Sequence, residues 1–244
     1  LARQRLEKAL ASAQELEIPL WIGDACIALS VIDRWAMDLE SSLAYRRRAL
    51  EAYRSIGYLK GVARAQHYIG TIHVFRGELT RALQILQDAL ETAREADFAV
   101  ESAGSLTDLA GVNFLLGDLE RAQIQYEEAA RLTTHPWRRG QLENNLGALL
   151  ADQDRHAEAL PRFEEALSLM RRAGDERLQA EILLSLGRSS YELKDFEAGV
   201  AHLDTAIALA RRWRIPVTEA YALQYKGCAM LDQDRLDEAV EALD

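Results

Sequence analysis

The sequence predicts an all-α solenoid of antiparallel helical hairpins, and three observations lead to this fold class. Abundant Ala, Leu, Glu and Arg, with only 4 Pro in 244 residues, suit helices. A small residue also recurs at a nearly constant interval, with steps of 40, 40, 37, 40 and 40 residues. Such a period indicates stacked units, because each unit needs its neighbours to bury its apolar face. These six markers are Ser30, Gly70, Ala110, Gly147, Gly187 and Gly227.

The third observation is a fixed pattern of side-chain sizes within each unit. Another small residue lies twelve positions after each marker, at Ser42, Ala82, Ala122, Ala159, Gly199 and Ala239. Alanine follows seven positions later, at Ala49, Ala89, Ala129, Ala166 and Ala206. A large residue usually lies between the two, at Leu86, Tyr126, Phe163, Leu203 and Leu243. Small residues let two helices approach closely, and the apolar spacing in both halves is helical, so each unit is a helical hairpin.

The markers also predict how the hairpins follow one another along the chain. Residues 1–15 are expected to form the second helix of a preceding repeat, and residues 1–244 a single solenoid. Proline lies eleven residues before three markers, at Pro19, Pro136 and Pro216, where it suits a helix start because its missing N–H would have no partner. The expected repeats cover approximately 23–58, 63–98, 103–135, 140–175, 180–215 and 220–244, the last being incomplete.

The turn between the two helices of a repeat contains Gly77 or Gly117 in two units and Asp154 or Asp234 in two others. Glycine and aspartate tolerate positive φ or hydrogen-bond a turn locally. Both aspartates belong to Asp-Gln-Asp-Arg strings, which lack the further ligand, the Gly and the closing Glu of a calcium loop. We therefore interpret these strings as turns between helices. Pro161 is expected near the start of a second helix, with little distortion.

One step of the period is irregular, the step of 37 residues between Ala110 and Gly147. The loss of three residues removes nearly one helical turn and shortens the link around residues 133–137. We expect the second helix of the third repeat to be short and the superhelix to change curvature there. Such an irregularity can border a pocket, although a plain deletion explains it equally well.

The stretch 146–166, with Gly147, Ala159, Phe163 and Ala166, resembles the tetratricopeptide repeat. That family places Gly or Ala late in the first helix, then Ala, a large residue and another Ala in the second. The resemblance extends over the whole chain and implies a right-handed superhelix whose first helices line the concave surface. The standard unit has about 34 residues, so these hairpins carry extra turns or longer links. Armadillo and HEAT repeats overlap this length but lack the regular Ala and Gly positions.

Composition and charge exclude several classes of function. The net charge of −10 argues against a general nucleic-acid binder, which needs a concentrated basic face. No apolar run reaches the roughly 18 residues of a membrane span, and no signal peptide is visible, so we expect a cytoplasmic location. Cys26 and Cys228 lie five repeats apart and are expected to be reduced, packed thiols.

The sequence contains no convincing catalytic or metal-binding pattern. A nucleophile needs a positioned base and an orienting group, and the five histidines fall in different repeats or on different helix faces. His67 and His73 share a helix but are six residues apart, which is not the spacing of a helical metal pair. A phosphate-binding Gly-rich loop and a Cys cluster are also absent. We therefore expect a non-enzymatic protein without a cofactor or a metal.

Arginine recurs 24 residues after four of the markers. These residues could form a ridge for phosphates or an acidic partner. The favoured interpretation is that each lies at the end of a second helix, where a cation interacts well with the last carbonyls and the helix dipole. The four residues are Arg54, Arg94, Arg171 and Arg211.

The resemblance also implies where a partner would bind. In the family pattern, inward positions of the first helix lie three and two residues before the marker, and one and four after it. Several of these positions carry hydrogen-bonding or aromatic groups that a core does not need, and an Asn can clamp the backbone of an extended peptide. For any single residue, a hydrogen bond to the neighbouring helix is an equally good explanation. The candidate groove residues are His67, Tyr68, Thr71, Asp108, Asn144, Asn145, Arg188, Tyr191, Gln224 and Tyr225.

Two functions follow as expectations. The main one is a protein- or peptide-interaction module, the sensory or regulatory repeat region of a larger multidomain regulator, because repeats of about this length look like those of bacterial signal-transduction ATPases and transcriptional activators. The groove departs from the family's clamp for terminal carboxylates, since Arg188 has no accompanying Lys at the matching positions. The alternative is a scaffold without a groove ligand, which forms homo-oligomers through uncapped solenoid ends.

Overall fold

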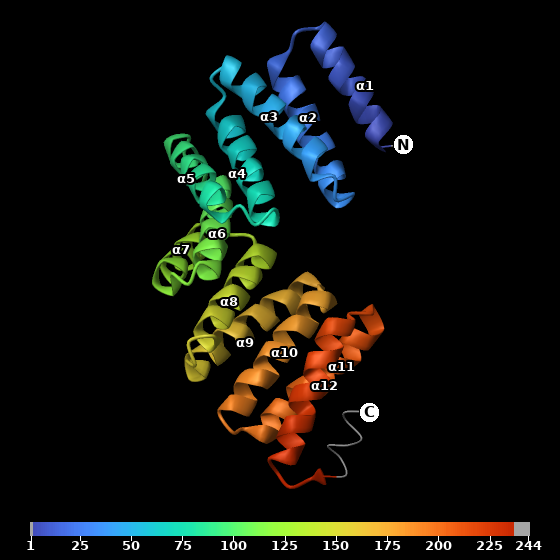
Figure 1. Cartoon of the computed structure of the whole chain (residues 1–244), viewed down its shortest axis with the longest axis vertical. Helices are drawn as coiled ribbons and strands as arrows, with labels where there is room; N and C mark the ends of the chain where they lie inside the picture. Colours follow the sequence, from blue (N-terminus) through green and yellow to red (C-terminus); the bar gives the residue numbers. More distant parts are fainter. Residues whose placement is uncertain (1, 237–244) are drawn as a thin grey trace. The chain divides into compact units, whose positions relative to one another are not determined.

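The computed structural model describes residues 2–236, and in this range the chain forms twelve α-helices and no β-strand (Figure 1). This confirms the all-α helical repeat solenoid. The helices fall into two compact units that meet in sequence between Leu132 and Thr133.

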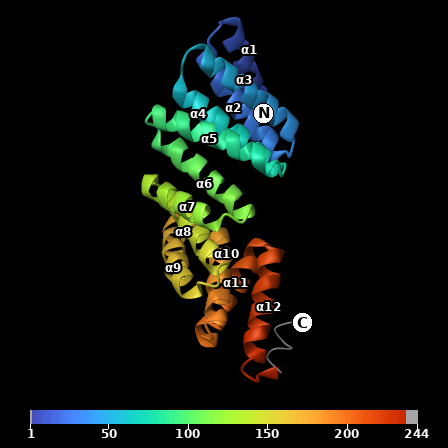
Figure 2. The same ribbon diagram turned by 60° about the vertical axis from the view of Figure 1, so that its left-hand side comes forward.

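Unit 1 begins with one single helix, which is followed by three helical hairpins. The first helix of each repeat packs on the second, so that α2 pairs with α3, α4 with α5, and α6 with α7 (Figure 2). Each second helix also packs on the next first helix, and α4 contacts α6 directly. The helices are α1 (Ala2–Glu15), α2 (Pro19–Trp35), α3 (Leu39–Ser55), α4 (Leu59–Phe75), α5 (Leu79–Glu95), α6 (Ala99–Leu115) and α7 (Leu119–Leu132).

Unit 2 repeats this arrangement with two hairpins and a further first helix. Here α8 pairs with α9 and α10 with α11, and the first helices α8, α10 and α12 contact one another in order. Both Pro136 and Pro216 begin first helices, as Pro19 does in unit 1, which confirms the expected role of these prolines. The helices are α8 (Pro136–Ala151), α9 (His156–Ala173), α10 (Glu176–Glu192), α11 (Phe196–Trp213) and α12 (Pro216–Leu231).

Each first helix begins four residues before the start that the sequence period suggested, for example at Pro19 instead of residue 23. The first helices thus include residues that the sequence period had left in the links. The second helix of the third repeat, α7, has 14 residues, against 17 or 18 in α3, α5, α9 and α11, so its expected shortness is confirmed. Helix α9 continues through Pro161 to Ala173.

The marker residues lie where the helices of one hairpin cross. A Cβ atom added to Gly147 would lie 2.6 Å from a ring carbon of Phe163, and one added to Gly70 would lie 2.6 Å from Leu86. The alanines of the size pattern from Ala49 to Ala206 are fully buried. The large residue therefore fills the space beside the small one, as the sequence predicts. Ala239 and Leu243 lie outside the described residues.

The turns between helices share one backbone feature. A residue with positive φ recurs every twenty positions in unit 1, from Glu17 through Gly117, and again in unit 2 from Asp154 to Asp234. Gly77, Gly117, Asp154 and Asp234 all have positive φ, which confirms their interpretation as turn residues. The short link before Pro136 contains no such residue.

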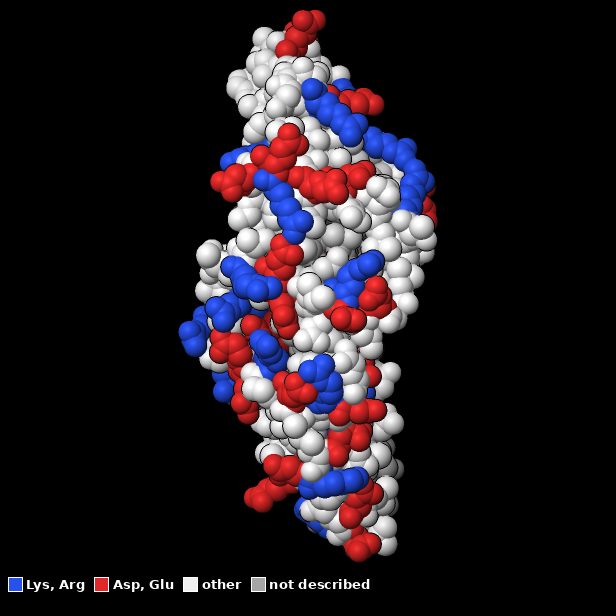
Figure 3. Space-filling view, turned by 90° about the vertical axis from the view of Figure 1, so that its left-hand side faces the viewer, with Lys and Arg blue, Asp and Glu red and all other residues white. Residues whose placement is uncertain are grey.

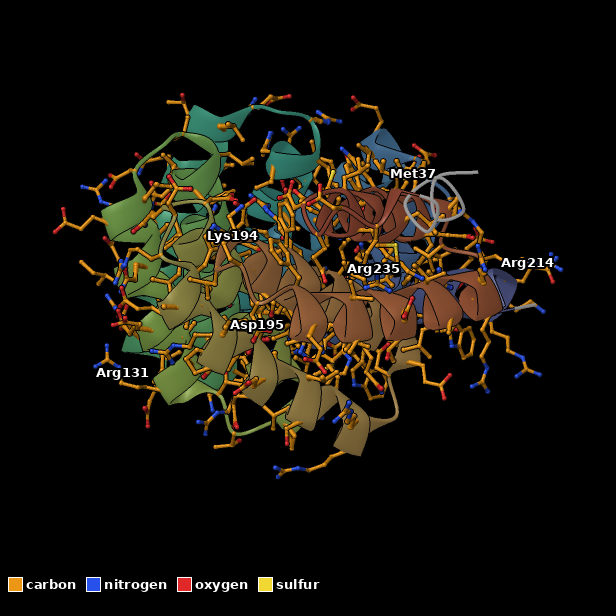
Figure 4. All side chains as sticks on the ribbon, turned by 90° about the horizontal axis from the view of Figure 1, so that it is seen from below. Met37, Arg131, Lys194, Asp195, Arg214 and Arg235 are labelled. Carbon is orange, nitrogen blue, oxygen red and sulfur yellow. The ribbon has the colours of Figure 1, made fainter. Side chains whose placement is uncertain are left out.

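We predict that Arg214→Gly stabilises the chain by up to about 1 kcal/mol. The left-handed conformation costs a residue other than glycine about 1–2 kcal/mol, and glycine removes this cost. Part of the gained stability is lost again, because glycine makes the unfolded chain more flexible. Arg214 has φ 54°, and Gly174 occupies the same turn position one repeat earlier with φ 70°. Figure 4 shows the Arg214 side chain extending away from the helices. Urea denaturation measures the change. Glu164→Gly, at an exposed position inside α9, serves as the control and should lose about 1 kcal/mol.

Candidate partner-binding face

The ten candidate groove residues lie on the first helices α4, α6, α8, α10 and α12. Nine of them are half-buried, and Gln224 is exposed. They therefore remain accessible to a partner although they pack against neighbouring helices. The two units supply separate sets: four residues in unit 1 and six in unit 2.

In unit 1 the candidate residues bond mainly to one another. The His67 Nε2 atom lies 2.9 Å from Asp108 Oδ2, which joins α4 to α6. The Thr71 hydroxyl lies 3.1 Å from the same carboxylate oxygen and 2.9 Å from the His67 carbonyl oxygen. Gly104 allows this approach, since a Cβ there would lie 2.7 Å from His67 Cε1. These polar groups are largely satisfied within the unit.

Tyr68 is held by Arg46, a residue outside the predicted groove set. The Arg46 guanidinium lies 5.1 Å from the centre of the Tyr68 ring, donates to the Tyr68 carbonyl oxygen and donates to Ser30 Oγ at 3.3 Å. Arg46 is only 1% exposed, and burial, followed by repulsion from Arg34, lowers its pKa to about 10. The signal was present, because position 46 is where the other repeats carry Leu86, Tyr126, Phe163 and Leu203.

In unit 2, Asn144, Asn145 and Arg188 lie on the adjacent helices α8 and α10. The Arg188 guanidinium lies 3.7 Å from Asp152 Oδ1, at the end of α8. Its Nε atom is buried and has no hydrogen-bond partner among the described residues, and the same is true of Asn144 Oδ1. Unlike the unit 1 set, these groups keep unused hydrogen-bonding capacity.

Aromatic residues continue this face toward α12. The Tyr191 and Tyr225 ring centres are 6.1 Å apart, and the Tyr191 hydroxyl donates to Asp232 Oδ2 at 3.1 Å. Lys194, labelled in Figure 4, lies over the Tyr191 ring at 5.2 Å and 3.7 Å from Asp232. We call the six residues Asn144, Asn145, Arg188, Tyr191, Gln224 and Tyr225 the α8–α10–α12 face.

Neither a metal site nor a membrane-spanning helix is found in the part of the chain that the structure describes. Within residues 2–236, no group of three His, Cys, Asp or Glu side chains could hold a metal ion. The described helices also include none that is long and apolar enough to span a bilayer. His67 and His73 lie in different surroundings, since His73 is fully buried while the His67 side chain is 16% exposed.

The recurring arginines lie at helix ends, as expected. Each of the four is in the last turn of its second helix. Arg94 pairs with Glu128 at 2.5 Å and Arg211 with Glu219 at 2.6 Å, so two of them are already bound to carboxylates. On the face shown in Figure 3, basic and acidic side chains alternate without a continuous basic surface.

Comparisons with known proteins agree with this architecture. The family model of the tetratricopeptide repeat matches residues 61–134 and 138–212, more than half of the chain. Outer dynein arm-docking complex subunit 4 of Bos taurus is 24% identical over 143 residues, which is 59% of this chain and 21% of that protein. The chain therefore spans about a fifth of that relative's length.

Three solved structures illustrate the similarity of fold. BtubC (BKLC) from P. vanneervenii has a TM-score of 0.77 at 19% identity, covering 87% of this chain and 91% of that one. The apo form of RapI gives 0.68 at 17% identity, covering 97% and 88%. YrrB, described as a TPR protein with an unusual peptide-binding site, gives 0.58 at 20% identity, covering 78% and 88%. Together with the helical hairpins and the marker residues, the family match shows that this chain is a protein-interaction module that belongs to the tetratricopeptide repeat family.

Proposed function

We propose that the α8–α10–α12 face binds an extended segment of a partner protein. The observation that carries this proposal is a pair of buried polar atoms at this face, Asn144 Oδ1 and Arg188 Nε, that have no hydrogen-bond partner within residues 2–236. An unsatisfied buried polar group costs about 1–3 kcal/mol, so a rotation of either half-buried side chain that brings this atom to a ligand recovers free energy. A peptide backbone presents donors and acceptors in alternation and suits this need.

The chemistry of the face fits such a segment. The amides of Asn144 and Asn145 can each donate and accept, as a main-chain clamp requires. Arg188, Tyr191 and Tyr225 are of the types that most often anchor interfaces, since they combine large contact area with a polar end. The face therefore combines backbone recognition with side-chain anchors.

The unit 1 set is the weaker candidate for the same role. His67, Thr71 and Asp108 hydrogen-bond to one another, and the Tyr68 carbonyl accepts from Arg46. A peptide would have to replace these bonds instead of completing empty ones. We therefore assign segment binding to unit 2.

The wider role is proposed from the resemblance of the repeats. A repeat region that binds a partner segment can report that binding to an attached domain, which suits a sensory or regulatory region of a larger protein. The fold shared with YrrB, whose description names a peptide-binding site, supports peptide binding as the mode of recognition. The alternative, a scaffold that self-associates, predicts a molar mass that rises with concentration in light scattering.

The test starts from peptides selected on the 244-residue chain from a phage-displayed library. We expect Arg188→Ala to weaken the selected peptides about tenfold in calorimetric titrations, since a charge-assisted hydrogen bond contributes about 1.5–3 kcal/mol. Arg172→Ala is the matched control, because Arg172 is an exposed arginine on the second helix α9 of the same unit. Equal affinity of both variants for every selected peptide would refute the proposed face.

A further inference from the structure

We propose that a pocket on unit 1 binds the side-chain carboxylate of an acidic segment of a partner protein. The pocket has a volume of about 200 Å³, is bounded by α3, α4 and α5 and shares no residue with the α8–α10–α12 face. We call it the Arg47 pocket. Besides three aliphatic side chains, its lining consists of Arg47, Arg54, Gln66, His73, Arg81 and Asp88.

Three arginine residues are among those that line this pocket. Arg47 and Arg54 are exposed and take part in no ion pair within residues 2–236. Arg81 has one weak ion pair in the same range, 3.6 Å from Glu78 Oε2. The pocket thus carries a net positive charge that Asp88 and the Arg81–Glu78 pair offset only in part, although the chain has a net charge of −10. Guanidinium groups bind carboxylates by paired, charge-assisted hydrogen bonds.

The buried side of the pocket carries two polar groups with unused hydrogen-bonding capacity. Gln66 is 8% exposed, and its Oε1 atom has no hydrogen-bond partner among the described residues. His73 is fully buried, with Nδ1 2.8 Å from Glu78 Oε2 and with Nε2 similarly unpartnered. A carboxylate by itself cannot donate to Gln66 Oε1. A peptide N–H next to an acidic side chain can, once the Gln66 side chain turns toward the pocket.

The remaining lining residues favour a carboxylate over a phosphate. Asp88 contributes a negative charge to the same wall, where it repels a doubly charged phosphate more strongly than a single carboxylate. The volume lies below the roughly 300–1,000 Å³ of pockets for drug-sized ligands and suits one acidic side chain. Leu50, Ile69 and Ile85 keep the local polarity low, which strengthens the charged hydrogen bonds.

The experiment titrates the 244-residue chain with a blocked peptide that has two adjacent glutamates, and with the same peptide carrying glutamines. We expect only the glutamate peptide to bind, and Arg47→Ala/Arg54→Ala to weaken it about tenfold or more by calorimetry. The control is Arg171→Ala/Arg172→Ala, because Arg171 holds the same repeat position as Arg54 and both control residues are exposed. Circular dichroism verifies that each variant is folded.

Three results would overturn the proposal. The first is the absence of binding of the glutamate peptide to the wild-type chain. The second is an equal affinity of the Arg47→Ala/Arg54→Ala variant and the control. The third is displacement of the peptide by inorganic phosphate at a similar concentration, which would make the pocket a phosphate site. Arg188→Ala is expected to leave this binding unchanged, so failure here is distinct from failure at the α8–α10–α12 face.

Discussion

Replacing Phe163 by alanine is expected to lower the free energy of unfolding by about 3–5 kcal/mol. Phe163 is 1% exposed, lies on α9 and belongs to the core of unit 2 with Leu186 and Leu203. Its ring fills the space that Gly147 leaves open on α8. Loss of the ring removes buried apolar surface and leaves a cavity where the two helices of the hairpin cross. Urea denaturation followed by circular dichroism measures the loss.

The same contact predicts that a second substitution, Gly147→Ala, changes the free energy of unfolding in opposite directions in two backgrounds. In the wild type, Gly147→Ala places a Cβ atom 2.6 Å from a Phe163 ring carbon, so the ring must shift and stability falls. In the Phe163→Ala background that clash is absent, and alanine is favoured over glycine in a helix by about 1 kcal/mol. Gly147→Ala should therefore stabilise the Phe163→Ala variant. The same effect in both backgrounds would contradict the proposed packing.

Replacing Tyr53 by alanine is expected to cost unit 1 a similar 3–5 kcal/mol. Tyr53 is fully buried on α3, between Gly23 of α2 and Gly61 of α4. A Cβ atom added to either glycine would lie within 2.5 Å of the Tyr53 ring. The ring therefore packs against both α2, the first helix of its own repeat, and α4, the first helix of the next repeat.

Tyr53→Phe separates this packing from the hydroxyl. The Tyr53 hydroxyl donates to Asp24 Oδ1 at 2.6 Å, and burial, followed by this bond, raises its pKa, so that it remains a donor. We expect Tyr53→Phe to cost only about 1 kcal/mol, since the ring stays and the exposed Asp24 regains water. Tyr221→Ala, at a residue 53% exposed, should change stability by less than about 0.5 kcal/mol. Equal losses for the Tyr53→Phe and Tyr53→Ala variants would refute the packing role.

The fold could be predicted from the sequence because the size pattern is periodic. Gly147 with Phe163 and Gly70 with Leu86 are contacts sixteen residues apart, so one register describes them all. Arg46 lies in the same register but is charged, where the other repeats carry a large apolar or aromatic residue. This difference is visible in the sequence. The positive φ at Met37 or Lys194 could not be predicted from residue type, because the turn position imposes it on residues that do not favour it.

The candidate sites were less accessible to sequence reasoning. The recurring arginines look equivalent in the sequence, yet the pairing of Arg94 with Glu128 depends on a residue in the next repeat. Side chains from three helices line the Arg47 pocket. Among these residues, the sequence period singled out only Arg54. That Asn144 Oδ1 and Arg188 Nε lack a hydrogen-bond partner among the described residues could not be inferred either, since the sequence does not place their neighbours.

The most direct test of partner binding is a chemical-shift map of the isotope-labelled chain with a library-selected peptide. The proposed function predicts that the largest changes occur in α8, α10 and α12, at Asn145, Arg188 and Tyr225 and their immediate neighbours. The second helices α9 and α11 should change little. If the largest changes instead lie on α9 and α11, or on unit 1 alone, the α8–α10–α12 face is not the binding site.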